Sequence, residues 1–187
     1  MTKTEPNIEK IYEENLKFWD EAWQRVSKPH KELPKLPYIH ELTRKLKKFR
    51  VKRVLDLGCG SGWLTIFMSK YGFEVTGIDT SNPAIELAKT WASEDKANIT
   101  LLAGDLLNLP FSDGSFDAVV CNSVLEHFRL EQAKIIFDKV SRDSNTGTIQ
   151  TSYDAAHDDP NTRKGTVSVG WGQTTIQIAT YLTNWKK

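Results

Sequence analysis

The chain has 187 residues with 25 basic and 24 acidic side chains, so its formal net charge at pH 7 is +1. This length suits one domain with a substantial core. The balanced charge gives no electrostatic reason to expect nucleic acid as a partner, and no apolar run approaches the ~20 residues of a membrane span.

The N-terminal segment predicts a helical cap followed by a connector. Residues 1–10 are polar and charged, so we expect no signal peptide and a cytoplasmic location. Apolar and aromatic side chains recur at helical spacing over residues 7–26, which predicts an amphipathic helix. Three prolines make residues 28–37 an irregular connector, and residues 38–49 predict a second helix. We interpret the cations of residues 45–53 as a solvated surface rather than an RNA contact.

The most informative stretch is residues 54–62. It begins with an apolar run that is too short for a helix and too hydrophobic for a surface strand, which predicts a parallel strand buried on both faces. Gly58, Gly60 and Gly62 follow at alternate positions, and a helical pattern begins at Trp63. Glycine lets the backbone turn sharply and approach a ligand, so a strand, a glycine turn and a helix in succession indicate a nucleotide site.

The glycine spacing separates two kinds of nucleotide site. A dinucleotide fingerprint is G-x-G-x-x-G, whereas this loop is G-x-G-x-G and continues into Trp63, which we expect to serve packing. With Asp56 in the preceding strand, the loop resembles the first motif of class I S-adenosylmethionine-dependent methyltransferases of the small-molecule type, similar to methyltransferase domains 11 and 25. The resemblance implies S-adenosyl-L-methionine as cofactor, contacted by Gly58, Cys59 and Gly60. Asp56 would support the loop and, directly or through water, the methionine amino group.

Asp79 ends the second predicted strand, 21 positions after Gly58. Doubly wound folds place a ribose-binding carboxylate at an interval of ~20 residues. The alternative role is a helix cap, but Asn82 followed by Pro83 predicts an N-cap and N1 proline for the next helix. We therefore interpret Asp79, with Thr80 beside it, as ribose-binding.

The third predicted strand, residues 99–103, is followed by Asp105 and Leu106. In the resembling family an acidic residue here accepts a hydrogen bond from the adenine amine, and the next backbone N–H meets a ring nitrogen. The alternative is an ordinary turn aspartate. Residues 109–120 are close to the family's entry into its fourth strand, which favours the adenine role for Asp105 and Leu106.

The fourth predicted strand, residues 116–121, leads into Asn122 and His127. Parallel-sheet enzymes keep their chemistry at the carboxyl ends of strands, so this loop is expected to face the reacting centre. The resemblance implies that the Asn122 carbonyl holds the methionine amino group and that His127 is a candidate general base or substrate-orienting group. A histidine bonded only to neighbouring backbone is the alternative. Cys59 and Cys121 follow neighbouring strands, so we expect the two thiols to be close without forming a disulfide framework.

The same resemblance adds a second interpretation of the helix over residues 7–26. It packs against the edge of the domain, or it crosses the mouth of the cofactor site, as N-terminal helices of such enzymes often do. In the second case Tyr12, Trp19 and Trp23 would line the substrate side. Both interpretations stay open at this point.

The C-terminal part departs from the family pattern. A helix is predicted over residues 130–140, a fifth strand over 148–153 and a polar linker over 154–165. Residues 166–169 and 174–183 predict an antiparallel hairpin. We expect one domain with a helical cap and connector (1–37), a cofactor-binding core (38–143) and a divergent, shortened β region (144–187). A shortened region implies a more open substrate side, or one completed by a second copy or a partner chain.

Together these features predict a fold, a function and two competing functions. The fold is an α/β Rossmann-like three-layer α/β/α sandwich, with a mostly parallel seven-stranded sheet of order 3-2-1-4-5-7-6 that ends in the hairpin. The function implied is in-line methyl transfer from S-adenosylmethionine to a small-molecule acceptor, without a metal. A methyltransferase-like cofactor-binding subunit or scaffold is the first competitor. A nicotinamide-dependent oxidoreductase is the second, disfavoured by the glycine spacing and by the lack of a clear Tyr-x-x-x-Lys pair.

Overall fold

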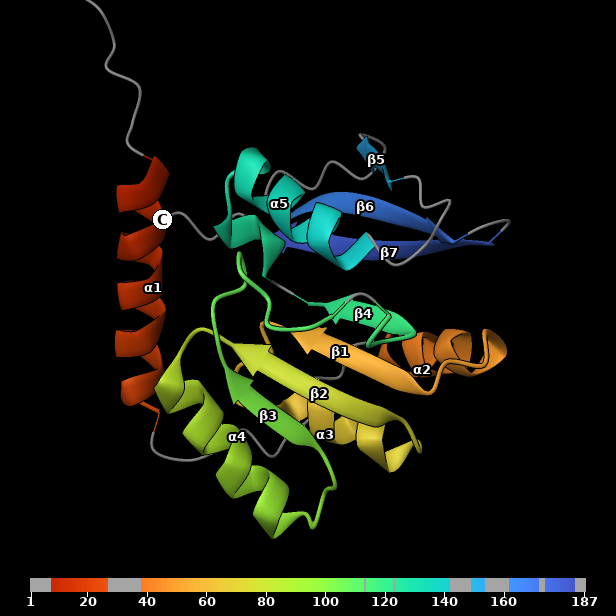
Figure 1. The fold of residues 1–187 in the computed structure, drawn as a ribbon, viewed down its shortest axis with the longest axis horizontal. Helices are drawn as coiled ribbons and strands as arrows, with labels where there is room; N and C mark the ends of the chain where they lie inside the picture. The colour runs from red at the N-terminus through yellow and green to blue at the C-terminus, as the bar shows by residue number, and fades with distance from the viewer. Residues whose placement is uncertain are drawn as a thin grey trace, which may run out of the picture. The chain divides into compact units, whose positions relative to one another are not determined.

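The computed structural model describes residues 8–26, 38–112, 114–122, 124–141, 149–153, 162–171 and 174–183. The chain divides into two compact units, Met1–Cys121 and Asn122–Lys187 (Figure 1). The predicted organisation as a single domain in three parts stays a prediction, and each unit is described by itself. Within the described residues, no helix combines the length and the apolar character needed to cross a bilayer.

The first unit alternates helices and strands in the predicted sequence. Its elements are α1 (Ile8–Gln24), α2 (Tyr38–Lys48), β1 (Arg53–Leu57), α3 (Trp63–Lys70), β2 (Glu74–Asp79), α4 (Asn82–Glu94), β3 (Thr100–Ala103) and β4 (Ala118–Cys121). Each lies within a few residues of its predicted range. An alternation of this kind is typical of a parallel sheet with helical crossovers.

The four strands of this unit form one parallel sheet in the order β3-β2-β1-β4, which confirms the first four positions of the predicted order. Leu57 at the end of β1 lies beside Ile78 of β2 and Cys121 of β4. Neighbouring residues of β1 point to opposite faces, yet Val54 and Leu55 are both fully buried. The strand is therefore buried on both faces, as its apolar run predicted.

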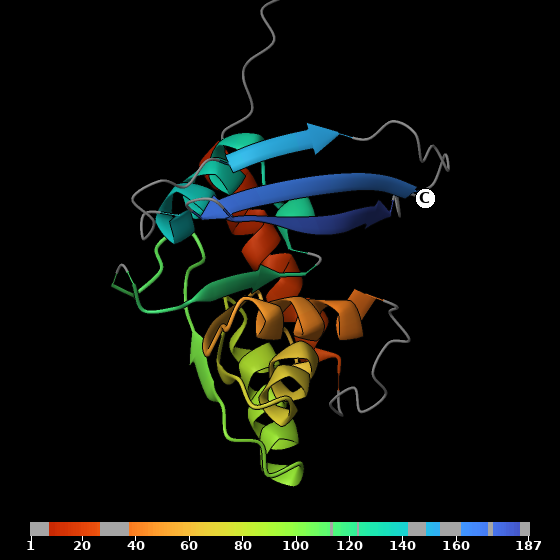
Figure 2. The same cartoon turned by 90° about the vertical axis from the view of Figure 1, so that its right-hand side faces the viewer.

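Helices α2, α3 and α4 cover the same face of this sheet (Figure 2). Leu46 of α2 and Met68 of α3 belong to one buried cluster with Val54, Val75 and Val120 of the strands. A second cluster joins α3 to α4 and β3; it contains Ile66, Trp91 and Ala92, with Leu101 packed against it. Trp63 packs against both clusters, so its predicted packing role is confirmed.

The second unit contains short helices and an antiparallel sheet. Its elements are the 3₁₀ turn η1 (Leu125–His127), α5 (Leu130–Ser141), β5 (Ile149–Tyr153), β6 (Thr162–Trp171) and β7 (Thr174–Thr183). The strands are ordered β5-β6-β7, and both pairings are antiparallel. In this unit, each described strand pairs with the next strand along the chain.

Two predictions for this C-terminal part differ from the structure. The expected order placed strand 7 between strands 5 and 6, whereas β6 lies between β5 and β7 in a sheet separate from the parallel one, so the single seven-stranded sheet is not confirmed. Short connections favour pairing between strands that are consecutive in sequence. The predicted polar linker also ended too late, because residues 162–165 already belong to β6 and pair with β7. Residues 154–161 lie outside the described residues.

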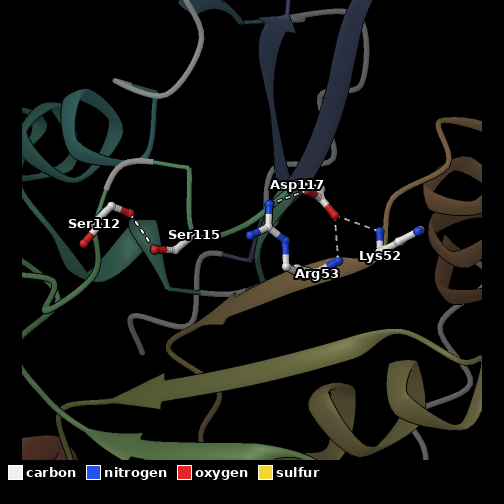
Figure 3. A network of polar contacts seen from close by, with 5 residues as sticks. All are labelled: Lys52, Arg53, Ser112, Ser115 and Asp117. Carbon is white, nitrogen blue, oxygen red and sulfur yellow. Dashed lines mark hydrogen bonds and ion pairs between the residues drawn. The ribbon is translucent and has the colours of Figure 1, made fainter.

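Asp117 ties the beginning of β1 to the segment that enters β4 (Figure 3). Its Oδ2 accepts hydrogen bonds from the backbone N–H groups of Lys52 (3.0 Å) and Arg53 (2.8 Å), and its Oδ1 lies 2.8 Å from the Arg53 guanidinium. The hydrogen bond from Arg53, and the other donors, lower the pKa of Asp117 to about 2. Nearby, the Ser115 hydroxyl donates to the Ser112 carbonyl and closes the preceding turn.

We expect Asp117→Ala to lower the free energy of unfolding by about 1 kcal/mol at pH 7, a value reduced for solvent screening because the side chain is 33% exposed. A carboxyl whose pKa is lowered on folding stabilises the protein above its unfolded pKa near 3.8, and this contribution is lost as the pH falls toward 2. Urea unfolding should therefore show a difference between wild type and variant that shrinks from pH 5 to pH 3. Glu86→Gln, which alters only an exposed pair with Lys89, is the control. A pH-independent difference would contradict the prediction.

Candidate cofactor site

The glycine loop between β1 and α3 is held against the end of β2. Gly58, Gly60 and Gly62 have φ angles of 69°, 53° and 78°, in the left-handed region that side chains other than glycine rarely adopt. The backbone N–H groups of Gly58 and Cys59 both donate to the Ile78 carbonyl, at 2.8 and 3.0 Å. The alternate glycines therefore permit a tight turn whose backbone is fixed to the neighbouring strand.

Asp79 joins the glycine loop to the loop after β2. Its Oδ2 accepts from the Gly60 N–H at 2.8 Å and its Oδ1 accepts from the Ser81 N–H at 2.9 Å. Burial raises the pKa of this carboxyl, while the backbone hydrogen bonds from Ser81, Gly60 and Thr80 oppose that rise. Each carboxylate oxygen can accept two hydrogen bonds, so Asp79 retains acceptor capacity for hydroxyl groups.

The start of α4 corrects one prediction. Ser81, not Asn82, is the N-cap residue: its backbone is extended, and its hydroxyl accepts from the Ala84 N–H at 3.4 Å. Asn82 is the first helical residue, and Pro83 therefore stands one position later than predicted. The extended conformation of Ser81 matches the preference of the residue that precedes a helix, and serine is a strong N-cap. Asp79 does not cap α4, so its acceptor capacity is not used there.

Asp56 is buried beneath the loop, with 2% of its surface exposed. Thr65 of α3 donates its hydroxyl to Asp56 Oδ2 at 2.6 Å. Burial raises the pKa of Asp56 to about 7, the hydrogen bonds from Thr65 oppose this rise, and the charge of Asp79 adds to it. Sequence reasoning missed Thr65; the available signal was a hydroxyl residue in the first turn of the helix that follows an aspartate-bearing strand.

The two cysteines are both free thiols. Cys59 is buried and its Sγ would lie 2.9 Å from a Cβ built on Gly77, so the side chain packs over β2 while its backbone forms part of the loop. Burial raises the pKa of the Cys59 thiol well above its usual value. The expected closeness of Cys59 and Cys121 stays a prediction.

Asp105 lies near the beginning of the loop after β3, and its side chain is exposed. The loop is attached to β2 because the Gly104 N–H donates to the Asp79 carbonyl at 2.9 Å. Asp105 Oδ1 accepts from the Leu107 N–H at 2.8 Å, and the side chain of Leu106 is buried. The loop thus presents a fixed carboxylate beside the backbone of a buried leucine.

Helix α1 crosses the end of the sheet toward which the arrowheads of β1 and β2 point (Figure 1). The Tyr12 hydroxyl donates to Asp105 Oδ1 at 2.5 Å, and the Ser81 hydroxyl donates to Asp20 Oδ1 at 3.1 Å. The Trp23 indole lies against Gly60, where an added Cβ would be 2.8 Å from Trp23 Cζ2. These contacts place α1 beside all three loops, and α1 also packs along α4, so both interpretations of this helix stay predictions.

Within α1, Trp19 packs edge-on against Phe18, with 5.2 Å between ring centroids. A substrate-side role for Tyr12, Trp19 and Trp23 stays a prediction. Sequence reasoning missed Asp20, although it lies eight residues after Tyr12 and therefore on the same helical face.

Asn122 and His127 belong to the second unit, and their predicted roles stay predictions. His127 ends the 3₁₀ turn η1, and its backbone N–H donates to the Val124 carbonyl at 3.0 Å. Both side chains are partly buried. Across the ranges that the structure describes, no group of three or more His, Cys, Asp or Glu side chains could hold a metal ion.

The first unit thus brings three kinds of group to one end of its sheet. The glycine loop offers backbone with no Cβ at three of its positions, Asp79 offers a carboxylate with spare acceptor capacity, and Asp105 offers an exposed carboxylate. Vicinal hydroxyls and an exocyclic amine are hydrogen-bond donors that such carboxylates accept. These residues fit an adenosine-containing cofactor.

Comparisons with known proteins identify the family to which the chain belongs. Residues 54–147, half of the chain, match a family model described as a methyltransferase domain. The ubiquinone biosynthesis O-methyltransferase of Coxiella burnetii is 36% identical over 131 residues, 68% of this chain and 55% of that protein. The mitochondrial enzyme of the same name from Schizosaccharomyces pombe is 40% identical over 99 residues, 50% of this chain and 35% of that one. The chain thus spans about half the length, or less, of these two relatives.

Among solved structures, magnesium protoporphyrin IX methyltransferase from Synechocystis PCC 6803 with bound S-adenosylmethionine has a similar fold. The TM-score is 0.61 at 18% identity, over 95% of this chain and 98% of that one, so this likeness concerns the fold. The matched residues include most of β1, the glycine loop and strands β2, β3 and β4. The chain belongs to the methyltransferase domain family, within the class I methyltransferases whose cofactor is S-adenosylmethionine.

Proposed function

We propose that this chain binds S-adenosylmethionine through the loops of its first unit and transfers the methyl group to an oxygen atom of a small-molecule acceptor. The observation that carries the proposal is the position of Asp79, whose two oxygens join the glycine loop to the loop after β2. The oxygen acceptor follows from the names of the relatives, which are O-methyltransferases.

The proposed contacts form three groups, one for each part of the cofactor: the ribose, the adenine and the methionine portion. Asp79 and Thr80 hold the ribose hydroxyls, and the Asp105 carboxylate with the Leu106 N–H holds the adenine. The glycine loop, including Gly58, Cys59 and Gly60, lies beside the methionine portion. Asp56, from beneath the loop, supports the loop and binds the methionine amino group directly or through water. The support is the hydrogen-bonding capacity of these groups and the match of their order to the family.

When bound, the cofactor supplies a methyl group on a positively charged sulfonium, which is already activated for transfer. The protein's contribution is to place the acceptor oxygen and to exclude water, and positioning of this kind supplies about 7–11 kcal/mol in favourable cases. A hydroxyl acceptor also needs to lose a proton, and His127 is the proposed base. Trp19 is proposed to line the acceptor side.

We expect Asp79→Ala to weaken cofactor binding by about 1.5–3 kcal/mol, roughly 10- to 150-fold, because hydrogen bonds to a charged group are lost. Isothermal titration with S-adenosylhomocysteine measures the effect. Asp95→Ala, which removes an aspartate paired with Lys70 at the far end of α4, is the matched control and should bind like wild type. Unchanged affinity in Asp79→Ala would remove this residue from the proposed site.

Transfer itself is tested with S-adenosylmethionine carrying a labelled methyl group and a panel of aromatic and aliphatic hydroxyl compounds. Label in an O-methylated product is the expected result. Cofactor binding without transfer to any member of the panel would favour the competing role of a cofactor-binding subunit.

A further inference from the structure

Helix α1 contacts each of the three loops that are proposed to hold the cofactor. Tyr12 contacts the loop after β3, Trp23 contacts the glycine loop, and Asp20 contacts the loop after β2 through Ser81. These contacts come from one face of a single helix, and α1 also packs along α4. The helix therefore contacts the same three loops that are proposed to bind the cofactor.

The Tyr12 contact makes one of the hydrogen bonds expected of adenine. Its hydroxyl donates to the Asp105 carboxylate, as an exocyclic amine would. Asp105 Oδ1 already accepts from both Tyr12 and the Leu107 N–H. An oxygen with two acceptor sites is then fully used, so an adenine amine has to replace Tyr12 there or be restricted to Oδ2.

The Trp23 contact fills the space that glycine leaves open in the loop. A Cβ added at Gly60 would come within 2.8 Å of Trp23 Cζ2 and 3.3 Å of Cη2, so the indole lies directly on the loop backbone. A glycine at such a position lets a ligand approach the backbone closely. In this structure an aromatic side chain of the same chain makes that approach instead.

From these contacts we infer that α1 blocks the cofactor site of its own chain. Tyr12 takes a hydrogen bond of the Asp105 carboxylate that is proposed to bind adenine, Trp23 covers the glycine loop, and the cofactor displaces both side chains when it binds. This inference rests on the proposed function, since it concerns regulation of the same site. As a consequence, the apparent affinity for cofactor equals the intrinsic affinity multiplied by the fraction of molecules in which α1 has left the site. Weakening the α1 contacts should then tighten binding.

The first test is titration of the full chain with S-adenosylhomocysteine, comparing wild type with Tyr12→Phe. The variant loses only the hydroxyl that contacts Asp105, and we expect about tenfold tighter binding, on the scale of one hydrogen bond to a charged group. Tyr71→Phe is the matched control, because it removes a hydroxyl that contacts His40 away from the site, at 3.2 Å, and should bind like wild type. Equal or weaker binding by Tyr12→Phe would overturn the inference while leaving the proposed function intact.

The second test is hydrogen exchange of the α1 amides in the wild-type chain with and without S-adenosylhomocysteine. Displacement predicts faster exchange across Ile8–Gln24 when the ligand is bound, whereas slower exchange would show that the helix closes over the ligand and would overturn the inference. Absence of S-adenosylhomocysteine binding in wild type and in both variants would reject the proposed function, and the inference with it. The far-ultraviolet circular dichroism of each variant establishes that it is folded.

Discussion

Replacing Gly62 by alanine is expected to lower the free energy of unfolding by about 2–5 kcal/mol. Gly62 has φ 78° and ψ 12° and immediately precedes α3, so any side chain there adopts the left-handed conformation at a cost of about 1–2 kcal/mol. An added Cβ would also lie 2.9 Å from the Ala88 Cβ and 3.5 Å from its Cα in α4. Relieving that overlap requires α3 and α4 to separate, and overpacking of this kind costs about 1–3 kcal/mol.

Gly72→Ala separates these two contributions. Gly72 has φ 87°, yet nothing lies within 4 Å of a Cβ built there, so this variant carries the conformational cost alone. Urea unfolding of both variants should show Gly62→Ala to be less stable than Gly72→Ala by about 1–3 kcal/mol. Equal losses would mean that the loop and α4 are not in the close contact that the structure describes.

The second large effect is the pH dependence that Asp56 gives to stability. Burial raises the pKa of this carboxyl to about 7, against 3.8 for an exposed aspartate. Between these values the folded chain binds a proton that the unfolded chain has released, so stability falls as the pH rises from about 4 to 7. Over the interval from pH 5 to pH 8 we expect Asp56 to account for a loss of about 2–3 kcal/mol.

Asp56→Asn removes this titration while keeping the size of the side chain and an oxygen that can accept from Thr65. Urea unfolding at pH 5 and pH 8 should show a smaller decrease in stability for the variant than for wild type, by about 2–3 kcal/mol. Asp79 also has a raised pKa, but it is present in both chains, so the comparison measures Asp56 together with its charge interaction with Asp79. Identical decreases would show that Asp56 does not titrate in this range.

Much of the first unit was predictable from sequence because its signals are local. The apolar run at residues 54–57 and the alternate glycines predicted β1 and the loop, and the structure has both. The positions of Asp79 and Asp105 at strand ends followed from chain order alone, since parallel strands finish at the same edge of a sheet. Their roles toward the cofactor stay predictions.

The remaining features depend on contacts between residues far apart in the sequence. The pairing of Tyr12 with Asp105 spans 93 positions, and no local pattern in α1 identifies which carboxylate it meets. Thr65 meets Asp56, nine positions earlier, only when the glycine loop turns the chain back, and Ser81 meets Asp20 across 61 positions. The early start of β6 escaped sequence reasoning because the polar segment 162–165 becomes a strand through its pairing with β7.

The measurement that tests the central claim most directly is isothermal titration of the wild-type chain with S-adenosylmethionine and S-adenosylhomocysteine, with NADH as the control ligand. Because Asp79 and Asp105 are proposed to accept from ribose and adenine beside a G-x-G-x-G loop, we expect micromolar binding of the first two ligands and none of NADH. Binding of NADH alone would favour the oxidoreductase alternative. Failure to bind any of the three would contradict the assignment of these loops as a cofactor site.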